Sequence, residues 1–243
     1  MELYIIRHGQ STNNASMMLD LRDREADPPL TELGQQQAEA VARYVAEHVN
    51  IDTWVEQAPH NRKVIHGFGI TQLFCSPMLR TLQTCRPIAT ALNLQPKVWV
   101  DIHEHGGLFL DYQDERGLVG FPGLTRADMG AQFPDYDLPP QIGETGWWNS
   151  EHGYEDIAAC QARAIRVAAA LRLQSNSSQR IALVSHGTFA DCLIKALLNL
   201  LPGEELRFFH YNTAITRVDF HADGKTIVRY TNRVDHLTPE LMS

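Results

Sequence analysis

Two histidines stand at the ends of short apolar runs, and a glycine follows each of them. Residues 5–9 read Ile-Ile-Arg-His-Gly, and residues 183–187 read Leu-Val-Ser-His-Gly. Each apolar run predicts a buried strand, so His8 and His186 are expected just beyond the carboxyl ends of two strands. Ligands of open α/β sheets bind beyond those ends. If the two strands are neighbours, both imidazoles face one crevice.

The segment after the first strand carries most of the groups that phosphoryl transfer needs. Hydrolysis of a phosphomonoester through an enzyme intermediate needs a nucleophile, positive charge on the phosphate oxygens and a proton for the leaving alkoxide. A neutral His8 can attack phosphorus, and the Arg7 guanidinium can pair with phosphate oxygens through parallel N–H donors. Gly9 permits close backbone approach, while Ser11 and Asn14 add neutral donors. The segment therefore predicts a phosphate pocket.

The composition is that of a soluble globular protein. The chain has 243 residues, of which 44% are hydrophobic and 21% charged, enough to bury a substantial core. Its formal net charge is -8, which argues against sequence-independent nucleic-acid binding, because that needs a basic face. An anionic substrate remains compatible with this charge, since a few arginines in one cleft set the local field.

The cysteines and the N-terminus both favour a cytoplasmic protein. None of the four cysteines forms a Cys-x-x-Cys pair, so we expect buried free thiols in a reducing compartment. No apolar run is long enough for a transmembrane helix, and the first residues do not resemble a signal peptide. We therefore expect no membrane partner.

Strand and helix patterns alternate along the chain. The alternation predicts a single domain, residues 1–243, that folds as a three-layer α/β/α sandwich with a mainly parallel mixed sheet. Residues 50–69 read as a loop or insertion, and residues 104–150, rich in glycine and proline, as a lid or specificity insertion. Strands are expected at 3–6, 70–75, 98–100, 181–184, 214–220 and 226–230, and helices at 33–49 (capped by Thr31), from Ser76-Pro77 to 92, at 154–173 and at 187–200.

Four segments in this order resemble the histidine phosphatase (phosphoglycerate mutase-like) superfamily. They span nearly the whole chain, and together they are far more specific than a lone Arg-His-Gly. They are Arg7-His8-Gly9-x-Ser11-x-x-Asn14, Leu30-Thr31-x-x-Gly34-x-x-Gln37-Ala38, Ser76-Pro77-x-x-Arg80-x-x-x-Thr84 and Ser185-His186-Gly187.

The resemblance implies a role for each of five residues. His8 is the residue that becomes phosphohistidine. Arg7, Arg80 and His186 bind the phosphoryl oxygens, and Asn14 is an accessory donor. Bound phosphate would favour the protonated form of His186. The family needs neither a metal nor a cofactor, so none is expected here.

The proton donor is best matched by Glu104. The family places a glutamate after the third strand with a glycine four residues on, but this chain has Leu108 at that position. Asp101 competes for the role because it lies at the same strand exit. Asp101, His103 and His105 also alternate along a possible strand, which leaves a metal site as an alternative.

Four residues are candidates for contact with the rest of the substrate: Ser11, His105, Arg116 and Trp147. Trp147 is more often a packing residue than a substrate contact, and Arg116 and Arg126 are either solvated charges or ligands of a second anionic group. The expected partner is a small phosphorylated metabolite, such as a sugar phosphate or a phosphoglycerate-type acid. The protein is expected to be a monomer or a homodimer.

Three functions remain open, with a phosphatase favoured. Cofactor-dependent phosphoglycerate mutases resemble a Glu-Arg-His-Tyr-Gly segment after the third strand, whereas residues 104–108 read Glu-His-Gly-Gly-Leu. The missing arginine and tyrosine favour hydrolysis, because a mutase must hold the acceptor and exclude water. An inactive scaffold that only binds a phospho-ligand is the third possibility, although the nucleophile and acid positions are both filled.

Overall fold

The computed structural model describes residues 1–15, 24–50 and 65–243. Its centre is a six-stranded sheet with the order β10-β9-β1-β8-β4-β5. Parallel pairing joins β1 to β8, β8 to β4 and β4 to β5, and only β9 runs against its two neighbours. The strands are β1 (Glu2–Arg7), β4 (Gln72–Cys75), β5 (Lys97–Val98), β8 (Arg180–Ser185), β9 (Ile215–Phe220) and β10 (Thr226–Arg233).

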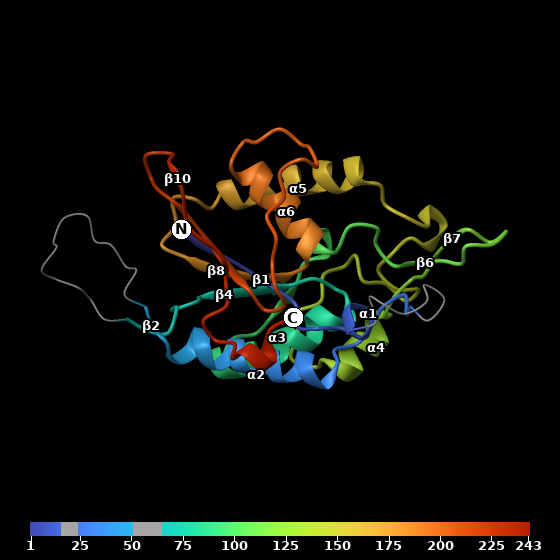
Figure 1. Cartoon of the computed structure of the whole chain (residues 1–243), viewed down its shortest axis with the longest axis horizontal. Helices are drawn as coiled ribbons and strands as arrows, with labels where there is room; N and C mark the ends of the chain where they lie inside the picture. Colours follow the sequence, from blue (N-terminus) through green and yellow to red (C-terminus); the bar gives the residue numbers. More distant parts are fainter. Residues whose placement is uncertain (16–23, 51–64) are drawn as a thin grey trace, which may run out of the picture.

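Helices cover both faces of this sheet. α2 (Glu32–Glu47) and α3 (Leu79–Leu92) lie on one face, and α5 (Ile157–Arg172) and α6 (Gly187–Leu197) lie on the other (Figure 1). β1 shows why, because its alternate side chains enter two separate cores. Tyr4 and Ile6 pack with α2 and α3, whereas Leu3 and Ile5 pack with α5 and α6. The three-layer α/β/α sandwich with a mainly parallel sheet is confirmed.

Several element boundaries differ from those expected. α3 begins at Leu79 with Met78 as its N-cap, two residues after the expected Ser76-Pro77 start. The Ser76 hydroxyl is hydrogen bonded to His186 and accepts from the Met78 N–H, so it serves the loop before the helix. The third strand is shorter than expected and gives way to a 3₁₀ turn at Val100–Ile102.

Residues 104–150 hold more regular structure than a loop. They contain a hairpin of β6 (Phe109–Asp111) and β7 (Leu118–Gly120), followed by α4 (Arg126–Gln132). The side chains of Met129, Phe133 and Trp147 are buried in the core under α3. Glycines and very short strands hid these elements, because neither gives a periodic apolar signal. A lid role for this segment stays a prediction.

The remaining elements are short. α1 (Thr12–Ala15) follows β1, and it lies at the same end of the molecule as α4, β6 and β7 (Figure 1). A two-stranded ladder joins β2 (Val49–Asn50) to β3 (Ile65–His66), while residues 51–64 of the expected 50–69 insertion lie outside the described residues. Short 3₁₀ turns occur at Ser150–His152 and Pro239–Leu241. Within the described ranges, no helix is both long and apolar enough to cross a bilayer.

The sheet order places the two histidine segments side by side. β1 and β8 are adjacent and parallel, and Arg7 is the register partner of Ser185. His8 and His186 therefore leave the sheet at the same edge, at its carboxyl ends, as the sequence predicted.

Candidate active site

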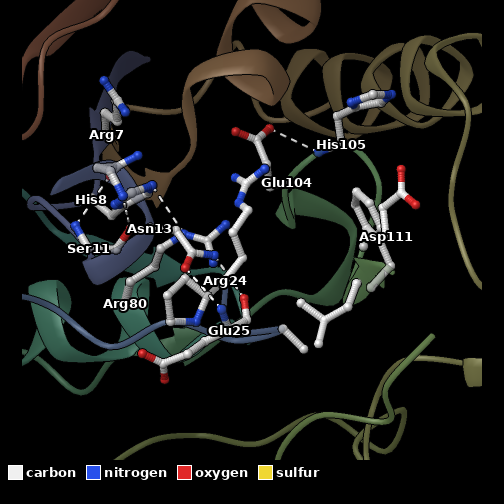
Figure 2. A pocket seen from close by; sticks show the side chains of 16 residues that line it. Arg7, His8, Ser11, Asn13, Arg24, Glu25, Arg80, Glu104, His105 and Asp111 are labelled. Atoms are coloured by element: carbon white, nitrogen blue, oxygen red, sulfur yellow. Dashed lines mark hydrogen bonds between the residues drawn. The ribbon is translucent and has the colours of Figure 1, made fainter. Parts of the chain in front are cut away.

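A pocket of about 240 Å³ opens at this carboxyl edge. Three segments far apart in the sequence form it: the loop after β1, residues 24–28, and residues 104–111, together with Arg80 of α3. Figure 2 shows Glu104 with His8 and Arg80 on one side and His105 and Asp111 on the other. The full lining is Arg7, His8, Ser11, Asn13, Asn14, Arg24, Glu25, Ala26, Pro28, Arg80, Glu104, His105, Gly107, Phe109, Leu110 and Asp111.

His8 is held as a neutral imidazole with its lone pair on Nε2. Its Nδ1 lies 2.7 Å from the Gly9 carbonyl oxygen, which can only accept, so Nδ1 carries the proton. Its Nε2 accepts from Arg80 Nε at 3.2 Å. Burial, with Arg80 and Arg7 nearby, holds the pKa of His8 well below its usual range. At neutral pH the ring therefore presents Nε2 as a nucleophile.

Close packing of glycines fixes the loop that carries His8. A Cβ on Gly9 would collide with the backbone of Gly34, and a Cβ on Gly34 would collide with that of Gln10. The Gly9 N–H donates to Thr84 Oγ1 at 3.0 Å, and the Gln10 N–H donates to Gln37 Oε1 at 2.8 Å. Residues of the motifs at 30–38 and 76–84 therefore hold the loop that carries His8.

Two arginines, the buried Arg80 and the partly buried Arg7, bring positive charge to His8. Arg80 is 8% exposed and, besides His8, its Nη2 contacts Met78 Sδ at 3.2 Å. Arg7 Nη1 donates to the His210 carbonyl at 2.6 Å, and its buried Nε has no partner among the described residues. Burial lowers the pKa of both guanidinium groups, but arginine stays protonated in proteins. An unpaired buried donor is costly unless a ligand accepts from it, and phosphate oxygens are suitable acceptors.

His186 lies beside His8 and behind the pocket surface. The ring centroids are 5.2 Å apart, and His186 is fully buried. Its Nε2 is hydrogen bonded to Ser76 Oγ at 2.8 Å, whereas its Nδ1 has no partner within the part of the chain that the structure describes. Burial and the nearby Arg80 hold the pKa of His186 well below its usual range, so the ring is neutral.

Glu104 lies in the pocket at the N-terminus of α6. Its Oε1 accepts from the Phe189 N–H at 2.8 Å and the His105 N–H at 2.9 Å, and its Oε2 from the Thr188 N–H at 3.2 Å. A carboxylate is favoured at such a helix end, where backbone donors are unsatisfied. Asp101, the competing acid, is exposed and is not part of the pocket lining.

A buried arginine, not anticipated from the sequence, anchors the segment before Glu104. Arg163 Nη1 donates to the carbonyl oxygens of Asp101 and His103, each at 2.8 Å, and its Nη2 is paired with Glu155.

The metal-site alternative rested on side chains that alternate along a strand. Residues 100–102 form a 3₁₀ turn, so that basis is wrong. Among the described residues, no group of three or more His, Cys, Asp and Glu side chains could hold a metal ion.

The four substrate-contact candidates divide into two pairs. Ser11 and His105 line the pocket, and the His105 Nε2 is hydrogen bonded to Tyr154 Oη at 2.9 Å. Arg116 is instead exposed and paired with Asp114 at 2.7 Å. Trp147 is buried in the core, which supports its packing role. Neither Arg116 nor Trp147 is part of the lining.

Two hydrogen bonds shape the turn after His8. Asn14 Oδ1 accepts from the Ser11 N–H at 3.2 Å, and the Asn14 N–H donates to Ser11 Oγ at 3.3 Å. Asn212 Nδ2 also reaches the His8 carbonyl at 2.9 Å. Asn14 thus lines the pocket, as expected, and also holds the loop. Arg126 lies elsewhere, where it donates to loop carbonyls at residues 138 and 139.

The pocket wall formed by residues 24–28 was not predicted from the sequence. Arg24 lines the pocket and has no hydrogen-bond or ion-pair partner among the described residues. Glu25 holds Asn13 through two backbone hydrogen bonds of 2.8 and 3.0 Å. This stretch is polar and aperiodic, and its only pattern signal is the Pro28-Pro29 pair at its end.

Comparison with known proteins supports one family. The model of the histidine phosphatase superfamily (branch 1) matches residues 3–55 and 52–233. The chain belongs to this superfamily. It is 29% identical over 228 residues to a probable phosphoglycerate mutase GpmB of Enterobacter sp. (strain 638), covering 90% of this chain and 85% of that one. The corresponding Yersinia enterocolitica protein is 25% identical over 225 residues, with the same two coverages.

Solved structures share the fold along the whole chain. A phosphoserine phosphatase from Entamoeba histolytica, in complex with 3-phosphoglyceric acid, has a TM-score of 0.57 at 21% identity and covers 98% of this chain and 99% of its own. A mycobacterial glucosyl-3-phosphoglycerate phosphatase with VO3 has a TM-score of 0.56 at 21% identity, with coverages of 96% and 99%. At these identities the likeness concerns the fold alone.

Proposed function

We propose that this protein is a phosphatase that hydrolyses small phosphomonoesters through a phosphohistidine at His8. The observation that carries the proposal is the state of that side chain. His8 is buried and neutral, its Nδ1 proton is fixed on the Gly9 carbonyl, and its Nε2 lone pair faces Arg80. A nucleophile prepared in this way beside two arginines suits attack on a phosphate.

The first step forms the phosphoenzyme. Arg80 Nε donates to the lone pair on His8 Nε2. When a substrate binds, its phosphate oxygens accept from Arg80 instead, and the lone pair becomes available for attack. His8 Nε2 then bonds to phosphorus while the bond from phosphorus to the leaving oxygen breaks. Arg7 and Arg80 stabilise the equatorial oxygens, and His186 donates to the transferring group when bound phosphate favours its protonated form. The bound phosphate anion likewise favours the protonated form of Glu104, which gives its proton to the leaving alkoxide.

The second step releases phosphate. Glu104, now a carboxylate, accepts a proton from water as the water oxygen bonds to phosphorus and the bond to Nε2 breaks. His8 returns to its neutral form with Nδ1–H on Gly9. The proposal needs no metal or cofactor, because the two arginines supply the positive charge.

The substrate is proposed to be a small phosphorylated metabolite. A pocket of about 240 Å³ has room for a phosphate and a small organic group. The solved structures of a phosphoserine phosphatase with 3-phosphoglyceric acid and of a glucosyl-3-phosphoglycerate phosphatase with VO3 support a sugar phosphate or phosphoglycerate-type acid. A screen of such esters with purified protein would identify it.

The His8→Ala variant tests the proposed reaction. It is expected to lose p-nitrophenyl phosphate turnover and acid-labile labelling by a radioactive phosphate donor. The loss should reach at least about 10⁴-fold, since the nucleophile and the covalent route disappear together. Wild-type turnover in a variant that stays folded by circular dichroism would contradict the proposal.

A phosphoglycerate mutase is the second candidate, and the names of the curated relatives favour it. Both reactions share the phosphoenzyme and differ in whether water or a bound acceptor takes the phosphoryl group. Isomerisation of 3-phosphoglycerate faster than its hydrolysis would select the mutase. Hydrolysis outrunning isomerisation would select the phosphatase.

A further inference from the structure

Asp27 is a carboxylate just behind the pocket wall that the proposed reaction does not use. Its neighbours Ala26 and Pro28 line the pocket, but Asp27 is not part of the lining. Its Oδ1 lies 3.8 Å from Arg80 Nη1 and accepts from the Leu79 N–H at 3.0 Å. One oxygen therefore contacts both the first turn of α3 and the guanidinium that this turn carries.

The contacts of Arg80 show what Asp27 adds. A guanidinium has five N–H donors in a rigid plane, so fixing its edges fixes where the remaining donors point. Nε points to His8, Nη2 to Met78 Sδ, and Nη1 towards Asp27. His8 and Met78 are neutral, so among these three contacts the only negative charge is that of Asp27. Glu104 also attracts Arg80, from the acid side of the pocket.

We propose that Asp27 is a positioning residue, which holds Arg80 against α3 so that its free N–H donors face the phosphate site beside His8. The proposal rests on the proposed function of that site. Without the carboxylate, the remaining negative neighbour draws the guanidinium towards Glu104. Arg80 can then no longer donate to a phosphate oxygen while it lies beside His8 Nε2.

Asp27 is not an obvious gain for stability. Burial raises its pKa to about 6, and Glu25 adds to this, while Arg80 and the Leu79 N–H act in the opposite direction. Because the pKa is raised on folding, the ionised group disfavours the folded state, and stability falls as pH rises from about 4 to about 6. If residue 27 had only a structural role, a neutral asparagine would stabilise the fold more than an ionised aspartate. The charge of Asp27 therefore indicates a role in the site.

The Asp27→Asn variant tests the inference, because an asparagine oxygen can still accept from Leu79 while the charge is gone. The readout is the affinity for inorganic phosphate, measured by calorimetry at pH 7.5. We expect binding to weaken by about 10- to 100-fold, as for misplaced binding groups, while the melting temperature stays the same or rises. Asp156→Asn is the matched control: Asp156 accepts from the Ala159 N–H at 2.8 Å and is not part of the pocket lining, so its loss should leave phosphate binding unchanged.

Two further measurements separate positioning from a general effect of charge. In an Arg80→Lys background, Asp27→Asn should cost at most about twofold, because coupled residues are non-additive. The ratio of wild-type to variant affinity should also fall towards one below about pH 6, where Asp27 is protonated. Wild-type affinity in Asp27→Asn, full additivity with Arg80→Lys, or a pH-independent ratio would each overturn the inference. Since phosphate binding needs no turnover, failure of the phosphatase proposal leaves this test intact.

Discussion

The two sides of the pocket are built by different means. The phosphate wall, formed by residues 7–14 with Arg80, is held by glycine packing and by side chains of α2 and α3 that bind its backbone. The acid wall, residues 104–111, is held by the N-terminus of α6 and by Arg163 of α5. Close backbone packing locks the phosphate wall, whereas hydrogen bonds from the α6 N-terminus and from Arg163 hold the acid wall. This difference predicts that the first tolerates almost no change, while the second sets which ester is accepted.

Glu104→Gln gives the largest effect expected in the acid wall. The amide can still accept from Phe189 and His105 but cannot donate a proton to an alkoxide. We expect the first turnover of an alkyl phosphate to slow by about 10²–10⁴-fold, the usual contribution of a general acid. Release of p-nitrophenolate, which needs no proton, should be nearly unchanged in that first turnover, as measured by rapid quench.

Asp101→Asn is the matched control for that prediction. Asp101 is exposed on the 3₁₀ turn outside the pocket, so both esters should react at wild-type rates. If Asp101→Asn slows the alkyl ester selectively and Glu104→Gln does not, the acid has been assigned to the wrong residue.

Gly34→Ala tests the phosphate wall. The added Cβ collides with the Gln10 backbone, so the loop that carries His8 must move. A displacement of about 1 Å at the nucleophile costs about 100-fold in kcat, and overpacking costs about 1–3 kcal/mol of stability. Steady-state kinetics and urea unfolding would measure the two effects.

Gly130→Ala provides the comparison within the same chain. Gly130 lies in α4, and nothing surrounds its added Cβ within 4 Å. The substitution should raise stability by about 0.5–1 kcal/mol, because alanine favours the helix. A Gly34→Ala variant that behaves like Gly130→Ala would show that the phosphate wall is not rigid.

The phosphate wall was the part of the site that the sequence could predict. Thr31, Gly34, Gln37 and Thr84 act on the loop after β1 through short, fixed contacts, so their types and spacings form a readable pattern. The sheet was equally readable, because its parallel strands are buried on both faces and appear as continuous apolar runs.

The acid wall and the wall of residues 24–28 were only partly readable. Arg163 lies on a helix whose apolar period predicts the core, and nothing local shows that it binds the carbonyl oxygens before Glu104. Asp27 and Arg24 stand in an aperiodic polar stretch, and their roles depend on how that stretch meets α3. Unlike Gln37 and Thr84, these residues stand outside the four segments that resemble the family, so no pattern in the sequence marks their contacts.

Arg24 lies between the two walls and gives the smallest expected effect. It is exposed, it lines the pocket without a partner among the residues that the structure describes, and its positive charge lowers the pKa of Arg80. A second anionic group on a substrate can pair with it, so Arg24→Ala should raise KM for a phosphorylated carboxylic acid by about tenfold, as for one charged hydrogen bond. KM for p-nitrophenyl phosphate should change less, because that ester has no second anion.

Arg116→Ala removes an arginine paired with Asp114 on the surface and should alter neither value. If Arg24→Ala raises KM equally for both esters, Arg24 belongs to the phosphate wall and does not contribute to the choice of substrate.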